Sequence, residues 1–187
     1  MPELPTLIIL AESESRHMAD GPRFATVTSA HASGGALDTV HHTIRKGLAS
    51  GLQVLLVAPP MVAAQAHQLL PAEHVILLPE PLAPNLAASN DQMALGVAIA
   101  VIASARSPGW LLLPGDMPLV RPASLLAVAS ALEQFPVAYA QHRGRRGYPV
   151  GFGAELYSEL MLLQGDDGAR RLMARYGEAA IAELRIG

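Results

Sequence analysis

The sequence has no cysteine among its 187 residues, which excludes disulfide bonds and thiolate metal sites. Aromatic residues make up only 4%, and 13 basic residues against 16 acidic residues give a formal net charge of −3. This balance gives no electrostatic basis for binding nucleic acid. The apolar runs are too short to span a bilayer, and the amino terminus lacks the features of a signal peptide. We therefore expect a cytoplasmic protein that binds neither nucleic acid nor a membrane.

Hydrophobic residues make up 51% of the chain, which is enough to form a sizeable core. Apolar runs typical of buried strands alternate with segments that have helical spacing of their apolar residues. The expected strands are 6–11, 53–58, 74–78, 110–113, 137–140 and 148–152, and the expected helices are 38–50, 61–70, 91–105, 122–134, 154–163 and 168–176. This alternation predicts one α/β domain over residues 1–187, with three layers and a central, mostly parallel sheet.

Specific residues predict where some of these helices face, begin and end. Val40, Ile44 and Leu48 have the spacing of one helix face, and Gly51 follows as a plausible stop. Asn90 is a candidate cap for the helix that begins at 91, and Pro122 suits the first position of the next helix. The stretches 12–35 and 79–90 are rich in glycine, proline and polar residues, and we expect functional or surface loops there.

An apolar run that starts at Leu111 ends abruptly in Gly115 and Asp116. An aspartate at the carboxyl end of a parallel strand lies where open α/β sheets build their ligand sites. A carboxylate there is also a natural ligand for a hard cation such as Mg²⁺, which carries phosphates with it. The alternative is an aspartate that only caps a helix or stabilises a turn.

Four segments, taken in order, resemble the signature motifs of the molybdenum cofactor nucleotidyltransferases, the MobA-like NTP transferase domain family. The segments are 10–19 after the first strand, 90–96, 115–120, and 146–150 followed by 165–170. The last two segments resemble the cytidylyltransferase branch most closely, and the guanylyltransferase branch is the nearer alternative. The resemblance implies a Rossmann-like fold of the nucleotide-diphospho-sugar transferase type. A small dehydrogenase would instead need a Gly-x-Gly-x-x-Gly turn after the first strand, and the chain has none there.

The resemblance also implies an activity and a set of residues. Such an enzyme transfers CMP or GMP from CTP or GTP to a molybdopterin-type acceptor and releases pyrophosphate, and a molybdoenzyme or its chaperone is a possible partner. Asp116 would hold Mg²⁺ and Arg16 would neutralise the pyrophosphate, so these two are the candidate catalytic residues. Asp166, or its neighbour Asp167, is the candidate second metal ligand, with capping of the helix at Gly168 as the alternative. The nucleotide-binding candidates are Leu10, Ala11, Glu12, Ser13, Arg16, Arg23 and Asp91, and the acceptor-binding candidates are Gly147, Tyr148 and Pro149.

Charged residues near these motifs have simpler interpretations. Arg143, Arg145 and Arg146 could bind an anionic acceptor, but a solvated loop is the slightly preferred interpretation. His41 and His42 are adjacent, so on a helix they point in different directions and do not form a metal pair. We interpret the histidines as structural or surface residues.

The sequence departs from the family pattern at the triphosphate side. Glu12 and Ser13 occupy positions where the family has Ala or Gly and then Gly, and Glu14 adds another acid. A side chain there obstructs the approach of backbone amides to phosphate, and carboxylates repel a polyanion unless a metal or an arginine offsets them. Three possibilities stay open: an enzyme with a reshaped loop, an enzyme for another nucleotide or sugar phosphate, or a catalytically silent protein that binds nucleotide or pterin.

Overall fold

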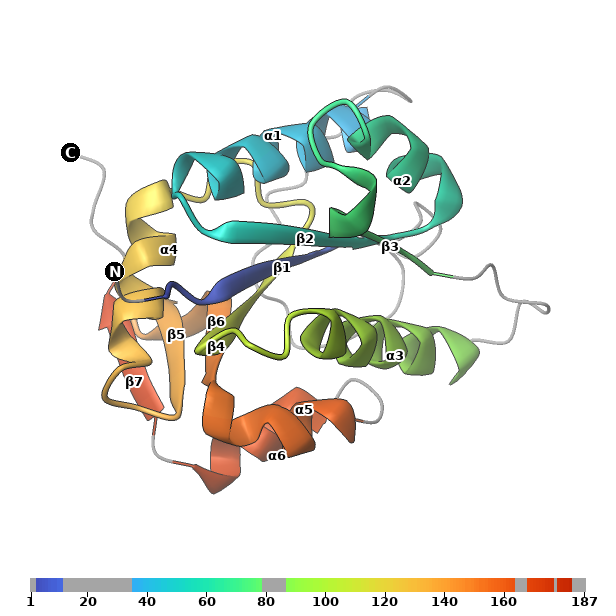
Figure 1. Ribbon diagram of the computed structural model, residues 1–187. Coiled ribbons are helices and arrows are strands. Elements are labelled where there is room, and N and C mark those ends of the chain that lie inside the picture. The colour runs from blue at the N-terminus through green and yellow to red at the C-terminus, as the bar shows by residue number, and fades with distance from the viewer. Residues whose placement is uncertain (1–2, 12–34, 79–86, 164–167, 177, 183–187) are drawn as a thin grey trace.

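A sheet whose seven strands lie in the order β3-β2-β1-β4-β6-β5-β7 forms the centre of the protein in the computed structural model (Figure 1). The structure describes residues 3–11, 35–78, 87–163, 168–176 and 178–182. Its strands are β1 (Thr6–Leu10), β2 (Gln53–Ala58), β3 (Val75–Leu77), β4 (Gly109–Pro114), β5 (Val137–His142), β6 (Arg145–Gly153) and β7 (Glu178–Ala182). β6 is antiparallel to β4 and β5, and the other pairings are parallel. The predicted mostly parallel α/β sheet is therefore confirmed.

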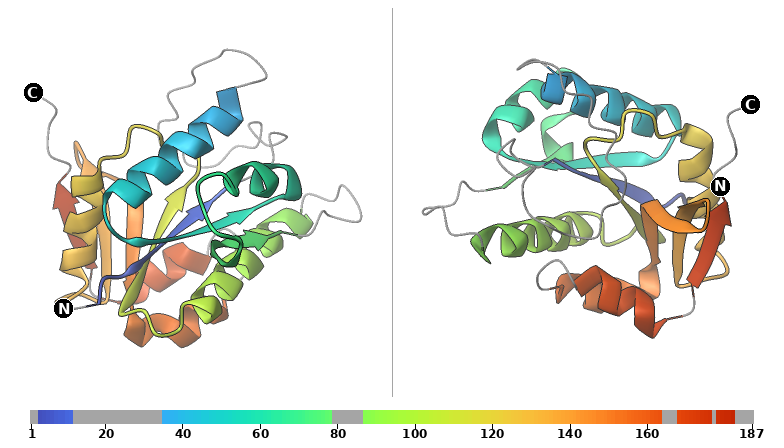
Figure 2. Two further views of the ribbon diagram at one scale, coloured as in Figure 1. Left: turned by 45° about the horizontal axis from the view of Figure 1, so that its top comes forward. Right: turned by 180° about the vertical axis from the view of Figure 1, so that it is seen from behind.

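Helices cover both faces of the sheet, which gives the expected three layers (Figures 1 and 2). The helices are α1 (Gly35–Ala49), α2 (Pro60–Ala66), α3 (Ala87–Ala103), α4 (Pro122–Ala131), α5 (Tyr157–Met161) and α6 (Gly168–Arg175), with short 3-10 turns η2 (Ala72–His74) and η3 (Ala154–Leu156). α1, α2 and α4 pack on one face and α3, α5 and α6 on the other. Successive β1 residues alternate between the two layers, because Leu7 and Ile9 join the first core and Ile8 joins the second.

The helix that covers β1 and β2 faces the sheet differently from its predicted orientation. Val40 and Ile44 are buried as expected, but Leu48 is 42% exposed. Gly47 faces the sheet instead, because a Cβ on it would lie 2.8 Å from Leu7 Cδ2. The helix therefore approaches the sheet closely at a glycine, and its last turn directs Leu48 to solvent. The predicted end of the helix near Gly51 is confirmed, since α1 ends at Ala49 and Gly51 follows with φ of 79°.

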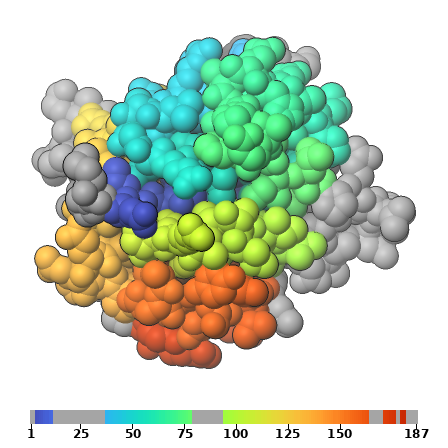
Figure 3. Space-filling model, viewed as in Figure 1, coloured from blue at the N-terminus to red at the C-terminus, as the bar shows by residue number. Residues whose placement is uncertain are grey.

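The helix over the other face begins earlier than predicted. α3 starts at Ala87, so Asn90 lies inside its first turn and is not its cap. The inner side of α3 packs tightly on β2, because a Cβ on Gly96 would lie 2.4 Å from Val57 Cγ1. Its outer side is uncovered across the face of the molecule shown in Figure 3. No helix in the described part of the chain has the length and apolar character to cross a membrane.

The end of the chain contains the one strand that the sequence does not predict among the described residues. β7 pairs with β5 in parallel, from Val137 opposite Glu178 to Gln141 opposite Ala182. The predicted helix 154–163 is instead a 3-10 turn followed by the short helix α5. Pro122 begins α4, as predicted.

Candidate active site at the β1–β4 switch point

The chain order of the strands places a topological switch point between β1 and β4. From β1 the chain moves outward to β2 and β3, and then returns to the other side of β1 as β4. In open α/β sheets, ligands bind at the carboxyl ends of the strands where the direction of winding reverses. Asp116 lies at this point, two residues after the end of β4 (Gly109–Pro114), at the carboxyl end of the strand that the sequence predicts. The Asp116 side chain is exposed to solvent, as a residue that meets a ligand must be.

Backbone hydrogen bonds hold the turn that carries Asp116. The Gly115 amide donates to the Leu10 carbonyl at 2.8 Å, and the next residue of the first strand, Ala11, donates to the Val57 carbonyl at 2.9 Å. A Cβ on Gly115 would lie 3.3 Å from both Ala11 Cα and the Leu10 carbonyl oxygen. The turn before Asp116 is therefore packed against the end of β1, and only a residue as small as glycine fits there without displacement.

A buried hydroxyl completes this arrangement from α1. Thr43 donates to the Gly115 carbonyl oxygen at 2.7 Å, across 72 positions in the sequence. No local pattern marks Thr43 as functional, because a threonine inside a helix ordinarily bonds to the carbonyl four residues earlier. Only the three-dimensional structure identifies its second, distant acceptor.

Of the predicted nucleotide-binding residues, the structure describes two side chains, those of Leu10 and Ala11. Leu10 ends β1 half-buried, and Ala11 is buried beside Gly115. Asp91 lies in the first turns of α3, but its side chain is outside the described part of the chain. Four further nucleotide-binding candidates and one metal candidate also lie outside the described residues; they are Glu12, Ser13, Arg16, Arg23 and Asp166.

The predicted acceptor residues lie at the same edge of the sheet. β4 and β6 are antiparallel, with Gly109 opposite Gly153 and Leu112 opposite Val150. The first half of β6 therefore lies at the carboxyl end of β4, and its first residues reach past that end. This half contains Gly147, Tyr148 and Pro149, of which Gly147 and Tyr148 are half-buried and Pro149 is buried. The peptide bond between Tyr148 and Pro149 is cis.

The basic cluster next to these residues is exposed to solvent, as the sequence predicts, and it lies on a tight hairpin. His142 pairs with Arg145, and the two residues between them, Arg143 and Gly144, have φ of 50° and 78°. Two left-handed residues are the geometry of a two-residue hairpin turn that matches the twist of its strands. Arg145 and Arg146 are thus strand residues of β6, exposed at the same edge as Asp116.

Asp116 is the one predicted metal ligand that the structure describes, and the described residues offer no complete metal cage. They contain no group of three His, Cys, Asp or Glu residues placed to hold a metal ion. Mg²⁺ is commonly held by one or two carboxylates together with the phosphates of a substrate. The exposed carboxylate of Asp116 fits that kind of site, in which the ligand supplies the remaining oxygens.

Comparison with known proteins agrees with this arrangement. The family model of the MobA-like NTP transferase domain matches residues 3–180. No curated protein matches the chain. Among solved structures, Rv0371c of Mycobacterium tuberculosis H37Rv is similar, with 19% identity, a TM-score of 0.70, and coverage of 97% of this chain and 88% of that chain. The same protein in complex with manganese gives 20% identity and a TM-score of 0.68 over 96% of this chain and 88% of that chain.

The fold is shared with further solved structures at lower identity. CMP:2-keto-3-deoxy-manno-octonic acid synthetase, solved with CTP, is 11% identical with a TM-score of 0.59, over 96% of this chain and 90% of that chain. Identities this low show a shared fold, whereas the family match spans nearly the whole chain. By its sequence, this chain belongs to the family of MobA-like NTP transferase domains.

Proposed function

We propose that the protein is a Mg²⁺-dependent nucleotidyltransferase that transfers CMP or GMP from CTP or GTP to a molybdopterin-type acceptor, with release of pyrophosphate. The observation that carries the proposal is the position of Asp116. Its exposed carboxylate follows β4 at the β1–β4 switch point, in a chain that the family matches from residue 3 to residue 180. Transfer of a nucleotidyl group depends mainly on positioning and on neutralising charge, and a metal ion held at Asp116 would supply both.

Asp116 would hold the metal ion, with Asp166 as the candidate second carboxylate. The bound ion would neutralise charge on the triphosphate and on the pyrophosphate that leaves. The complex of Rv0371c with manganese supports the choice of a divalent cation. The CTP complex of the synthetase supports the choice of a nucleoside triphosphate as ligand of this fold.

The two substrates would bind on opposite sides of Asp116, the nucleotide on the β1 side and the acceptor on the β6 side. On the β1 side, the end of the strand at Leu10 and Ala11 leads into the segment with Arg16, which would neutralise the pyrophosphate. On the β6 side, Gly147 and Tyr148 would face the acceptor, next to the exposed arginines of the hairpin. A phosphate-bearing acceptor would therefore meet positive charge as it approaches Asp116.

The experiment is an assay for pyrophosphate release with purified protein, Mg²⁺, molybdopterin and either CTP or GTP. We expect turnover with one of the nucleotides and its loss in Asp116→Asn. Glu133→Gln is the matched control, because Glu133 is an exposed carboxylate that follows α4 and precedes the start of β5, at the opposite edge of the sheet. Full turnover by Asp116→Asn would contradict the proposed role of this residue.

The second candidate is a catalytically silent family member that binds nucleotide or pterin as a partner of another enzyme. The observation that favours it is the run Glu12-Ser13-Glu14. Glu12 and Ser13 stand where the family has small residues beside the triphosphate, and Glu14 adds a second carboxylate. This candidate predicts binding of a nucleotide or of the pterin, without pyrophosphate release under any combination of nucleotide and acceptor.

A further inference from the structure

Thr43 lies at the centre of α1 and is completely buried. Its hydroxyl is 2.7 Å from the Gly115 carbonyl oxygen and 3.0 Å from the carbonyl oxygen of Thr39, four residues earlier in the helix. A hydroxyl has a single proton to donate, and the shorter contact is the one with Gly115. The Thr43 hydroxyl therefore donates mainly to the Gly115 carbonyl and not to the Thr39 carbonyl within the helix.

The acceptor of this hydrogen bond belongs to the peptide group that joins Gly115 to Asp116. The amide on the other side of Gly115 donates to the Leu10 carbonyl at 2.8 Å. The turn is thus attached to β1 through an amide and to α1 through a carbonyl. Because a peptide group is planar, fixing its carbonyl oxygen also fixes the direction in which the chain enters Asp116.

The surroundings of Gly115 leave little freedom for the turn to shift in another way. A Cβ on Gly115 would lie 3.3 Å from each of three atoms, namely Ala11 Cα, the Leu10 carbonyl oxygen and Val40 Cγ2. Val40 comes from the same helix as Thr43. α1 therefore contacts the turn twice, once by packing and once by a hydrogen bond, and only the hydrogen bond determines the rotation of the peptide group.

We propose that Thr43 is a positioning residue that orients the carboxylate of Asp116 for a divalent cation, an inference that rests on the proposed function. A buried hydroxyl is more costly than an apolar side chain of the same shape unless its hydrogen bond is used. Packing of α1 alone would be served equally well by valine, which matches the shape of threonine. A residue that orients a metal ligand without touching the metal commonly affects how tightly the metal binds.

The test measures Mn²⁺ affinity by electron paramagnetic resonance, with the whole protein and saturating CTP or GTP. Thr43→Val should weaken Mn²⁺ binding roughly tenfold, in the range for residues that support a metal ligand. Thr43→Ser keeps the hydroxyl and should restore the affinity of the unaltered protein. In an Asp116→Asn background, Thr43→Val should cause no additional loss, because Thr43 acts only through Asp116.

Two results would overturn the inference while the proposed function stands. One is unchanged Mn²⁺ affinity in a folded Thr43→Val protein, and the other is an equal loss in the presence and in the absence of the Asp116 carboxylate. Thermal melting of each variant, without metal, separates loss of the fold from loss of the site. If the unaltered protein binds no Mn²⁺ with either nucleotide, the proposed function itself fails and this inference fails with it.

Discussion

The guanidinium carbon of Arg146 lies 4.8 Å from the centre of the Tyr139 ring. Tyr139 is buried in β5 and Arg146 is exposed on the neighbouring strand β6, so the guanidinium packs over the face of the ring. Such a contact combines electrostatic attraction with packing, and it suits arginine better than lysine. The hairpin thus keeps a preorganised positive charge at the edge of the sheet where Asp116 lies.

The arginines at the hairpin are predicted to act on the acceptor and not on the nucleotide. We expect Arg143→Gln combined with Arg145→Gln to lower kcat/KM for the acceptor by about tenfold, the effect of losing about 1.4 kcal/mol of charge-assisted hydrogen bonding. The KM for the nucleotide should not change. Steady-state kinetics at two salt concentrations would measure this, with a smaller salt dependence expected in the variant.

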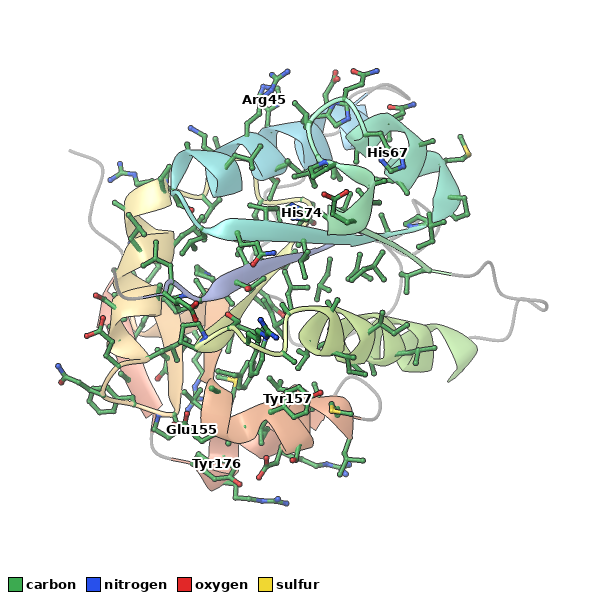
Figure 4. The ribbon with its side chains drawn as sticks, in the orientation of Figure 1. Arg45, His67, His74, Glu155, Tyr157 and Tyr176 are labelled. Atoms are coloured by element: carbon green, nitrogen blue, oxygen red, sulfur yellow. The ribbon has the colours of Figure 1, made fainter. Side chains whose placement is uncertain are left out.

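Arg45→Gln is the matched control for that pair, because Arg45 projects from the outer side of α1 (Figure 4). It removes an exposed positive charge elsewhere on the molecule. An equal effect of Arg45→Gln on the acceptor would show that only the overall charge matters, and would contradict a local role for the hairpin.

The close approach of α3 to β2 predicts a packing defect at Gly96. A Cβ there would lie 2.4 Å from Val57 Cγ1 and 2.8 Å from Leu78 Cδ2. We expect Gly96→Ala to lower the free energy of unfolding by about 1–3 kcal/mol, as overpacking does in well-filled cores. Urea denaturation would measure it. Combining it with Val57→Ala should cost less than the sum of the two single changes, whereas a simple sum would contradict direct contact.

Much of the fold is predictable because buried parallel strands leave a strong signal. β2 has the predicted bounds, since six residues from Gln53 to Ala58 form an apolar run between turn signals. β7 gives no such signal: its Ala-rich segment 178–182 resembles helix more than strand, and only pairing with β5 makes it a strand. The face of α1 is also set by the tertiary structure, because the periodicity of its apolar residues does not reveal the close contact at Gly47.

The corrected orientation of α1 leads to a direct comparison between two of its residues. Ile44 is fully buried whereas Leu48, one turn later, is 42% exposed. We expect Ile44→Ala to lower the free energy of unfolding by about 2–5 kcal/mol. Leu48→Ala should change it by no more than about 0.5 kcal/mol. Chemical denaturation of both variants tests this, and similar losses would support the orientation predicted from the sequence instead.

A hydrogen bond between α5 and the end of α6 predicts a pH-dependent contribution to stability. The Tyr176 hydroxyl donates to Glu159 Oε1, and this bond lowers the pKa of Glu159 and raises the pKa of Tyr176. Figure 4 shows Tyr176 on the side of the molecule that carries α5 and α6. A lowered carboxyl pKa stabilises the fold above the unfolded value of 4.5, and this stabilisation disappears as the pH falls through the lowered pKa.

The raised pKa of Tyr176 makes a contribution to stability that changes with pH in the opposite direction. Its stabilisation is complete below the unfolded value of 10.0 and disappears as the pH rises through the raised pKa. Because the lowered pKa of Glu159 also depends on this bond, Tyr176→Phe should be less stable than the unaltered protein near neutral pH, with a difference that shrinks as the pH falls below 4.5. Denaturation curves over a series of pH values measure the difference, and a constant gap would contradict a role for this bond.

The candidate site divides into a part that the sequence can predict and a part that it cannot. Asp116 follows an apolar run that ends in Gly115, and such a pattern predicts both the strand and its exposed end. The contacts that hold this end depend on residues distant in the sequence. Thr43 is 72 positions from Gly115, and nothing around Thr43 distinguishes it from other helix residues. The tight turn at Arg143 and Gly144 is not evident from the apolar pattern, because β5 and β6 extend further than their apolar residues do.

The most direct test of the metal site is calorimetric titration with CTP and then GTP, each with and without Mg²⁺, of the unaltered protein and of Asp116→Asn. We predict that one nucleotide binds only when Mg²⁺ is present, and that Asp116→Asn weakens this metal-dependent binding. Binding that is equal in the two proteins, or no binding of either nucleotide to the unaltered protein, would contradict a metal-dependent nucleotide site at Asp116.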